Sequence, residues 1–268
     1  MKNKVKRGRP AKKQNLPGVK ITKFTPELVK MDDISFNEDL FIPMKTGKKI
    51  DALLSSEGGL MKGTNFAFIG DPGVGKTTVM LDILADLQAK GQKVLFVSGE
   101  MNQIDMHGYV KRFPKFGQVP ILFLGDYIEK DPIVILKSVL SEGYDAVLID
   151  SMAEVCVSIV DFHGGTNKSA ESKVLNLMEV HNKGGNRDDK NTTFLIIQQV
   201  TKAGTFAGSN RFKHMLTGMC AMRFVEGGRN LSFSKNRRGG QMDQLFFSLD
   251  QKNNVGWLHT EAMNSPMQ

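Results

Sequence analysis

The sequence contains only two cysteines, Cys156 and Cys220, and neither belongs to a CxxC pair. Two distant cysteines support neither a disulfide framework nor a zinc ribbon, and they are typical of a reducing intracellular compartment. No run approaches the ~20 apolar residues that a membrane helix needs. The basic N-terminus is not followed by the apolar segment of a secretory signal. We therefore expect neither an integral membrane protein nor a secreted one.

The length and composition fit a folded core. The chain has 268 residues, of which 40% are hydrophobic. That length suits one domain of the larger sort, or one domain with an appendage. The apolar fraction excludes a chain that is disordered throughout.

The net charge of +8 is concentrated at the N-terminus. Residues 1–30 contain ten lysines and arginines against one acid, whereas the remaining residues together carry a net charge of −1. Residues 1–15 contain almost no large apolar side chain, so they cannot pack into a core. We therefore predict that residues 1–30 form a disordered basic arm, which accounts for the high isoelectric point.

Within this arm, KRGRP (residues 6–10) resembles the core of an AT-hook. In that motif two arginines, here Arg7 and Arg9, lie in a narrow and strongly negative minor groove. The same residues also suit a polybasic tail that attracts phosphates without sequence preference, a nuclear import signal or a solubility tail. A·T-rich duplex DNA is therefore one candidate partner of the arm.

A glycine-rich loop stands between a predicted strand and a predicted helix. TNFAFIG (64–70) has the character of a buried strand, GDPGVGKTT (70–78) follows it, and VMLDILADLQAK has apolar residues at helical spacing. The loop meets the pattern G-x-x-x-x-G-K-[ST], in which backbone N–H groups and a helix N-terminus surround a phosphate chain. We predict that Lys76 contacts the β- and γ-phosphates of ATP and that the Thr77 hydroxyl holds Mg²⁺. The predicted nucleotide-binding residues of the loop are Gly70, Asp71, Pro72, Gly73, Val74, Gly75, Lys76, Thr77 and Thr78.

Polar side chains end the other predicted strands. KVLFVSGE ends at Glu100, ILFLGD at Asp126, YDAVLID at Asp150, and TTFLIIQQ at Gln198 and Gln199. Ligands of parallel sheets bind at the carboxyl ends of the strands. Asp150 is therefore the candidate Mg²⁺ ligand, and Glu100 is the candidate general base for an attacking water. A helix cap or a surface charge is the preferred interpretation of Asp126.

Three longer segments resemble the RecA family of ATPases. TGKKIDALLSSEGGLMKGTNFAFIGDPGVGKTT (46–78) is similar to the segment that leads into a RecA-type P-loop. SGEMNQIDMHGYVKRF (98–113) is similar to the S-G-E segment of RadA/Sms and DnaB-type ATPases. QQVTKAGTFAG (198–208) and KNRRG (235–239) are similar to RadA's H-V-T-K-[ED]-G-x-[IL]-A-G and K-N-R-F-G. The resemblance is strongest to RadA, with DnaB-type helicases as close relatives.

The resemblance implies roles for individual residues. Glu100 matches the catalytic glutamate, and Gln199 lies where a γ-phosphate sensor is found. Lys235 and Arg237 match the pair that reaches the ATP of the adjacent subunit, where two cations would neutralise charge on the γ-phosphate. Tyr109 lies where a side chain stacks on adenine, and ordinary helix packing is the alternative for that ring.

The sequence also departs from RadA. It has no cysteine quartet for a zinc finger, and we expect no Lon-like domain after the core. Ala203 stands where RadA has an acid, and Arg238 stands where it has phenylalanine. We expect these differences to affect branch migration more than the ATPase chemistry.

By position in such a core, two segments are expected to face single-stranded DNA. The first is a polar and mobile loop over residues 157–173, and the second is a loop over residues 201–214. In the second loop the candidate phosphate contacts are Lys202, Arg211 and Lys213. Its aromatic residues, Phe206 and Phe212, either stack on bases or are buried beneath the loop.

Together these features predict an α/β fold: a RecA-like P-loop NTPase core whose mostly parallel central sheet is flanked by helices and ends in a C-terminal antiparallel meander. The expected core spans residues 40–262 and is followed by a tail, 263–268. We expect an ATPase that uses ATP and Mg²⁺, forms a hexameric ring or a filament on single-stranded DNA, and acts in recombination, repair or replication. The expected location is the cytoplasm, in association with DNA. The alternatives are a DnaB-type replicative helicase and an ATP-switched DNA-binding scaffold with little turnover.

Overall fold

The computed structural model describes residues 27–35, 37–200, 208–226, 228–240, 244–249 and 255–258. The chain divides into two units, residues 1–36 and residues 37–268. The described part of the first unit contains one short 3-10 helix, η1 (Met31–Asp33). The predicted AT-hook arginines, Arg7 and Arg9, lie outside the described residues. In the part of the chain described, no helix is long and apolar enough to cross a membrane.

The second unit is built on one sheet with the strand order β3-β2-β4-β5-β1-β6-β7-β8-β9. Strands from β3 to β6 in this order pair in parallel, and β6 to β9 pair antiparallel. The predicted fold class, a mostly parallel sheet with a C-terminal antiparallel meander, is therefore confirmed. The strands are β1 (Asn65–Gly70), β2 (Val94–Ser98), β3 (Ile121–Phe123), β4 (Ala146–Asp150), β5 (Thr193–Gln198), β6 (Gly218–Val225), β7 (Gly228–Asn236), β8 (Leu245–Leu249) and β9 (Val255–Leu258).

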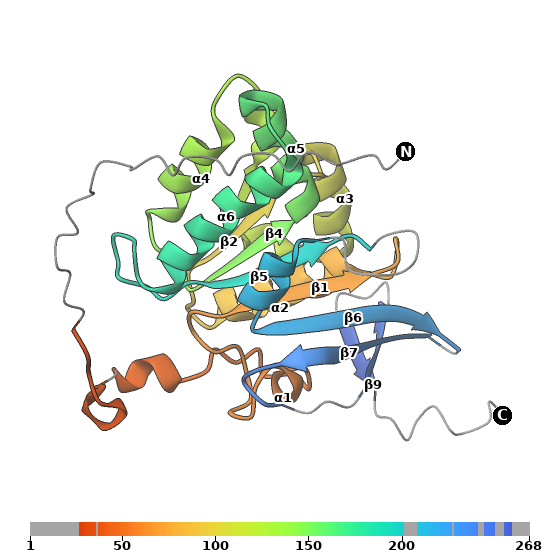
Figure 1. Cartoon of the computed structure of the whole chain (residues 1–268). Helices are drawn as coiled ribbons and strands as arrows, with labels where there is room; N and C mark the ends of the chain where they lie inside the picture. Colours follow the sequence, from red (N-terminus) through yellow and green to blue (C-terminus); the bar gives the residue numbers. More distant parts are fainter. Residues whose placement is uncertain are drawn as a thin grey trace, which may run out of the picture. The chain divides into compact units, whose positions relative to one another are not determined.

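Helices cover both faces of the sheet (Figure 1). Along β1 the side chains alternate, so that Phe66 and Phe68 enter one core while Ala67 and Ile69 enter the other. The first core contains residues of α1 (Asp51–Leu54), α2 (Lys76–Ala89) and the meander, with α3 (Gln103–Arg112) against its edge. The second contains residues of α4 (Pro132–Leu140), α5 (Met152–His163), α6 (Asn167–Asn182) and α7 (Asn210–Met215). The remaining described 3-10 helices are η2 (Glu38–Phe41), η3 (Pro114–Gln118) and η4 (Leu124–Tyr127).

Two predicted features differ from the structure. The segment 157–173 is not a loop, because most of it belongs to α5 and α6, and only residues 164–166 separate the helices. Ile159 and Ala170 are buried on the inner sides of these helices, so the polar residues between them occupy solvent-facing helical positions. The third predicted strand ends at Phe123 instead of Asp126, because the chain turns there into η4.

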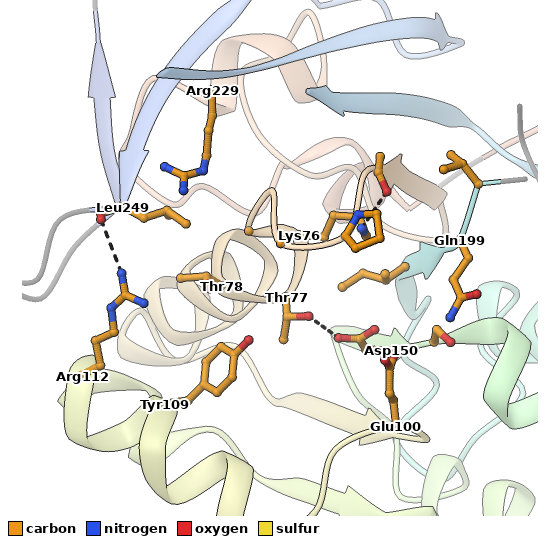
Figure 2. A pocket seen from close by; sticks show the side chains of 17 residues that line it. Lys76, Thr77, Thr78, Glu100, Tyr109, Arg112, Asp150, Gln199, Arg229 and Leu249 are labelled. Carbon is orange, nitrogen blue, oxygen red and sulfur yellow. Dashed lines mark hydrogen bonds between the residues drawn. The ribbon is translucent and has the colours of Figure 1, made fainter. Parts of the chain in front are cut away.

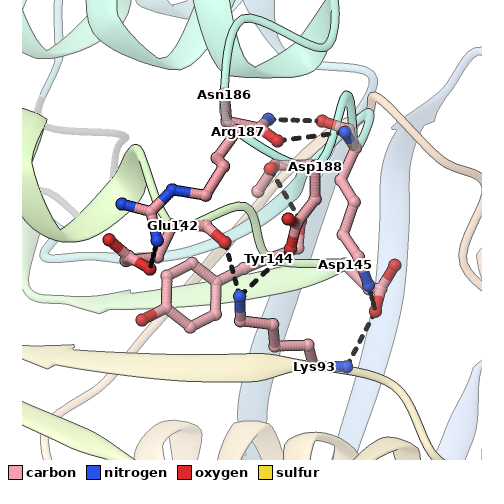
Figure 3. Close-up of polar contacts among 9 residues, drawn as sticks. Lys93, Glu142, Tyr144, Asp145, Asn186, Arg187 and Asp188 are labelled. Atoms are coloured by element: carbon pink, nitrogen blue, oxygen red, sulfur yellow. Dashed lines mark hydrogen bonds and ion pairs between the residues drawn. The ribbon is translucent and has the colours of Figure 1, made fainter.

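A polar network fixes the amino ends of three parallel strands (Figure 3). The backbone N–H of Lys93, just before β2, donates to Asp145 Oδ2 at 2.7 Å, and Lys190 Nζ lies 2.5 Å from the same oxygen. Arg187, in the loop before β5, pairs with Glu142 at 2.7 Å. Because the strand starts are aligned, β2, β4 and β5 also end together at the opposite edge of the sheet.

A second charged cluster joins α2 to the turn that contains Lys48 and to the 3-10 helix η3, which contains Lys115. Asp82, on α2, is fully buried, and its carboxylate pairs with Lys48 at 2.6 Å and with Lys115. Asp86, one helical turn further along, pairs with the same two lysines. Asp51 orients the Lys48 segment, because its carboxylate accepts hydrogen bonds from the backbone N–H groups of residues 46 and 47. Two separate segments of the chain are therefore tied to one face of the helix that follows the P-loop.

Candidate nucleotide site

The P-loop connects the end of β1 to the start of α2, as the sequence predicted. Gly75 has a φ of +99° and precedes the first helical residue, Lys76. A Cβ at Gly75 would lie 2.5 Å from Leu249 Cδ1, and a Cβ at Gly70 would lie 2.1 Å from the carbonyl oxygen of Met222. Glycine is needed at these positions because the C-terminal meander packs directly against the loop. The free N–H groups of the first turn of α2 make this loop suited to bind phosphates.

Three strands bring their polar ends to the same edge beside the P-loop. Ser98 of β2 lies opposite Asp150 of β4, and Asp150 lies opposite Ile197 of β5. The N–H of Gly99 donates to the carbonyl oxygen of Asp150 at 2.8 Å, which holds the residue after it, Glu100, next to the end of β4. Gln199 follows the end of β5 at this edge. The strand order thus gathers side chains that lie 49 to 99 positions apart in the sequence.

Thr77 and Asp150 have the chemistry of a magnesium site. The Thr77 hydroxyl donates to Asp150 Oδ2 at 2.5 Å. Burial and, to a smaller extent, the negative charge of Glu100 raise the pKa of Asp150 to about 6. The hydrogen bond from Thr77 and the positive charge of Lys76 act in the opposite direction. Hydroxyl and carboxylate oxygens are the ligands that Mg²⁺ prefers, with phosphates and waters completing its coordination. The two residues therefore fit a Mg²⁺ ion that arrives with a nucleotide.

Lys76 folds back over the P-loop. Its Nζ donates to the carbonyl oxygens of Gly70 at 2.8 Å and Asp71 at 2.9 Å. Burial lowers the pKa of Lys76, while the charges of Asp150, Asp71 and Glu100 oppose that shift. The ammonium group thus lies directly beside the space that a phosphate chain would fill.

A cavity of about 480 Å³ unites these groups (Figure 2). It is lined by most of the predicted nucleotide and catalytic residues: Gly70, Pro72, Gly73, Gly75, Lys76, Thr77, Thr78, Glu100, Tyr109, Asp150 and Gln199. Two predicted P-loop residues are not part of its lining. Val74 is buried in the core, and Asp71 faces Lys76 through its carbonyl group.

The cavity is also lined by residues that the sequence analysis did not predict: Arg112, Ser151, Ile197, Val200, Arg229 and Leu249. A sequence signal existed for Arg112, which lies three positions after Tyr109 and therefore on the same side of α3. No local pattern pointed to Arg229 or Leu249, because they reach the cavity through the antiparallel pairing of β7 and β8.

The other predicted functional residues lie elsewhere. Lys235 and Arg237 do not line the cavity, and Lys235 Nζ instead donates to the carbonyl oxygen of Lys213 at 2.6 Å. Arg211 and Lys213 are exposed on α7, whereas Phe212 is fully buried, so the packing alternative holds for this ring. Lys202 and Phe206 lie outside the described residues.

Comparison with known proteins supports the resemblance to RadA. No protein-family model matches the chain. "DNA repair protein RadA" of Campylobacter jejuni is 28% identical over 234 residues, which cover 85% of this chain and 49% of the relative. The Helicobacter pylori protein of that name (strain 26695) is 27% identical over 231 residues, covering 81% and 46%. The chain therefore spans about half the length of these relatives.

A solved structure shares the fold. A KaiC-like protein from the archaeon Pyrococcus horikoshii superposes with a TM-score of 0.58 at 15% sequence identity, covering 81% of this chain and 99% of the other. This likeness concerns the fold alone. Together the comparisons confirm a RecA-like fold and a sequence similar to the RadA core.

Proposed function

We propose that this chain is an ATP-hydrolysing enzyme of RadA type that works on single-stranded DNA. The observation that carries the proposal is the convergence of a P-loop, the Thr77–Asp150 pair, Glu100 and Gln199 on one cavity. A phosphate-binding loop alone would suit many nucleotide-binding proteins. A carboxylate beside the magnesium pair adds a base for water, which a purely structural nucleotide site does not need.

Each residue has a part in this reaction. The backbone N–H groups of the P-loop and the first turn of α2 bind the phosphates, and Lys76 turns from its carbonyl partners toward them. Thr77 and Asp150 hold Mg²⁺, which neutralises charge on the β- and γ-phosphates when it is bound. Glu100 orients the attacking water and accepts its proton. Gln199 lies beside the γ-phosphate. It senses whether this phosphate is present and signals this to the segment that follows β5.

Lys235 and Arg237 act on the nucleotide of a neighbouring subunit in this proposal. These two residues do not line the nucleotide cavity of their own subunit, which supports an action in trans. The backbone N–H of Arg237 donates to the carbonyl oxygen of Thr217 at 2.9 Å, and the residue is exposed at the surface. Because the cations come from another copy, hydrolysis would depend on assembly into a ring or filament.

The DNA-contacting surface would lie around α7. Arg211 and Lys213 supply exposed positive charge there. Ser209, the residue that caps α7, is held by buried Glu171, whose carboxylate accepts from its backbone N–H at 3.2 Å and from its hydroxyl. This anchor ties α7 to α6. A DNA-repair role, as the names of the relatives suggest, is part of the same proposal, and so is a cytoplasmic location.

The test is steady-state ATP hydrolysis with and without single-stranded DNA. We expect DNA to stimulate turnover. We also expect Glu100→Gln to lower it by about 100-fold or more while nucleotide binding is kept. Lys235→Ala should abolish stimulation, whereas Lys183→Ala, a change at an exposed lysine on the far end of α6, should not.

Mixing the variants tests the action in trans. A mixture of Lys235→Ala with Glu100→Gln protein should regain turnover, because sites with an intact base then face an intact lysine. Turnover that is negligible and indifferent to DNA would instead indicate an ATP-switched DNA-binding scaffold. Strand separation coupled to hydrolysis would favour the helicase alternative.

A further inference from the structure

The candidate base, Glu100, lies in the short connection between β2 and α3. Its side chain is exposed and lies beside Asp150 at the cavity (Figure 2). None of the hydrogen bonds or ion pairs among the described residues involves the Glu100 carboxylate. A general base must lie within hydrogen-bond reach of the water that it activates. The position of this carboxylate therefore depends on the backbone that carries it.

One buried hydroxyl closes this connection into a turn. Ser98 is the last residue of β2, and its side chain is buried. Its Oγ accepts a hydrogen bond from the backbone N–H of Met101 at 3.1 Å and donates to the carbonyl oxygen of the same residue at 2.9 Å. Both the donor and an acceptor site of the hydroxyl are thus used. Glu100 lies inside the turn that this single side chain closes.

Gly99 ties the same turn to the strand that carries the candidate Mg²⁺ ligand. Its N–H donates to the carbonyl oxygen of Asp150 at 2.8 Å. A Cβ at Gly99 would lie 3.2 Å from Glu154 Cβ and 3.3 Å from the backbone nitrogen of Val155, so α5 packs closely against this residue. The turn is therefore held on the side that faces β4 and α5.

The start of α3 fixes the other end of the connection. The side-chain oxygen of Asn102 accepts hydrogen bonds from the N–H groups of Ile104 at 2.8 Å and Asp105 at 3.1 Å. The Asp105 carboxylate accepts in return from the N–H of Asn102 at 3.1 Å, which completes a capping box. Because this box begins directly after Met101, the Ser98 hydroxyl joins the end of a buried strand to a helix start that is itself held in place.

We propose that Ser98 is a positioning residue, which holds the backbone of Glu100 where its carboxylate reaches the attacking water. The inference rests on the proposed function, because it assumes that Glu100 is the base for ATP hydrolysis. Without the hydroxyl, the N–H and the carbonyl group of Met101 lose the partner that closes the turn. A displacement of about 1 Å at a reacting group can lower a rate on the order of 100-fold. Nucleotide binding should be spared, since in the described part of the chain the Ser98 hydroxyl bonds to Met101 and not to the P-loop.

The test is steady-state ATP hydrolysis by the wild type, Ser98→Ala and Ser98→Cys, together with titration of the fluorescent nucleotide mant-ADP. Cysteine nearly keeps the size of serine but is only a weak donor and acceptor, so it guards against effects of the space that alanine leaves. We expect both variants to lower kcat by about 10- to 100-fold, while KM for ATP and the affinity for mant-ADP change by less than about twofold. Ser98→Thr keeps the hydroxyl and should keep kcat within about threefold of the wild type.

Thr193→Val is the matched control. The Thr193 hydroxyl is fully buried and donates to the carbonyl oxygen of Met61 at 2.8 Å. Thr193 begins β5, so it lies at the edge of the sheet opposite the cavity. This variant also removes a buried hydroxyl that bonds to the backbone. It should lower the free energy of unfolding, as Ser98→Ala does, but leave kcat unchanged.

Two further measurements separate positioning from a merely structural role. If Ser98 acts through Glu100, the double variant Ser98→Ala/Glu100→Gln should turn over no more slowly than Glu100→Gln alone. Hydrogen–deuterium exchange tests the contact independently of turnover. The N–H of Met101 should exchange about fivefold faster in Ser98→Ala than in the wild type, while the N–H of Gly99, which is bonded to Asp150, stays protected.

Four results would overturn the positioning role. They are unchanged kcat in Ser98→Ala and Ser98→Cys, unchanged exchange at Met101, a loss of mant-ADP affinity as large as the loss of kcat, and a further loss of turnover in the double variant. Wild-type protein that hydrolyses no ATP would overturn both the proposed enzyme and the role of Ser98. Wild-type turnover that collapses in Glu100→Gln but persists in Ser98→Ala would overturn the role of Ser98 alone.

Discussion

Replacing Asp82 by asparagine should destabilise the second unit strongly, although Asp82 lies outside the cavity lining. The Asp82 carboxylate is fully buried and pairs with Lys48 at 2.6 Å and with Lys115. Asp82→Asn keeps the size of the side chain but removes its charge. Both lysines would then share Asp86 as their remaining acid in the cluster.

The expected loss of stability follows from the burial of the Asp82 carboxylate. Removing one partner of a buried ion pair costs about 3–5 kcal/mol, because a charge is left without compensation. Here the two lysine side chains are 23% and 26% exposed and keep Asp86, so the lower end applies. A loss of about 3 kcal/mol corresponds to a melting temperature lower by about 6–12 °C for a domain of this size.

Thermal denaturation followed by circular dichroism measures this effect. Asp86→Asn is the matched control, since Asp86 is more exposed and pairs with the same lysines, and its effect should be clearly smaller. Equal shifts for the two variants would refute the assignment of the stability to the buried carboxylate.

The loss of stability caused by Asp82→Asn should also be the same at pH 7 and pH 9. Burial lowers the pKa of Lys48, but its hydrogen bonds to Asp82 and Asp86 outweigh this and raise the pKa above its ordinary value. A raised pKa in the folded state means that the stabilisation is complete below about pH 10.4 and is lost only as pH rises through the folded value. A difference between the two variants that vanished by pH 9 would contradict this account.

Two further predictions concern the P-loop and the thiols. Gly75→Ala should abolish tight binding in a titration with the fluorescent nucleotide mant-ADP. It should also lower the free energy of unfolding by more than Gly91→Ala does. Both glycines have positive φ, but only at Gly75 would the new Cβ meet a neighbour, and equal effects would contradict the steric argument. Burial raises the pKa of Cys156 to about 12 and raises that of Cys220 as well, so neither thiol should react with Ellman's reagent until urea unfolds the chain. Rapid labelling of the native protein would disprove their burial.

The sequence predicted the parts of the site that local patterns encode. The P-loop was visible because a strand, a glycine-rich loop and an amphipathic helix follow one another directly. Glu100 and Asp150 could be placed together because the carboxyl ends of parallel strands share one edge. The structure places these residues around one cavity, in agreement with that expectation.

The sequence could not reveal contacts that depend on register between distant strands. Arg229 reaches the cavity because it pairs with Phe247 in the meander, and the meander itself contains an irregularity between Met219 and Cys220. The partners of Asp82 come from a turn and from η3, which no short-range pattern connects to α2. The helices over residues 157–173 were missed because Gly164 and Gly165 and the polar residues around them outweighed the buried apolar positions at helical spacing.

The order of the strands has a consequence during synthesis. Among the described strands, β1, which leads into the P-loop, pairs with β5 and β6, and 122 residues (71–192) separate its last residue, Gly70, from the first residue of β5, Thr193. At about 5–20 residues per second, translation of that interval takes roughly 6–25 s. Throughout this time a strand rich in phenylalanine has no sheet partner. The growing polypeptide therefore exposes an aggregation-prone segment until its second half emerges, and a chaperone that shields residues 65–70 on the ribosome would improve the yield of native protein.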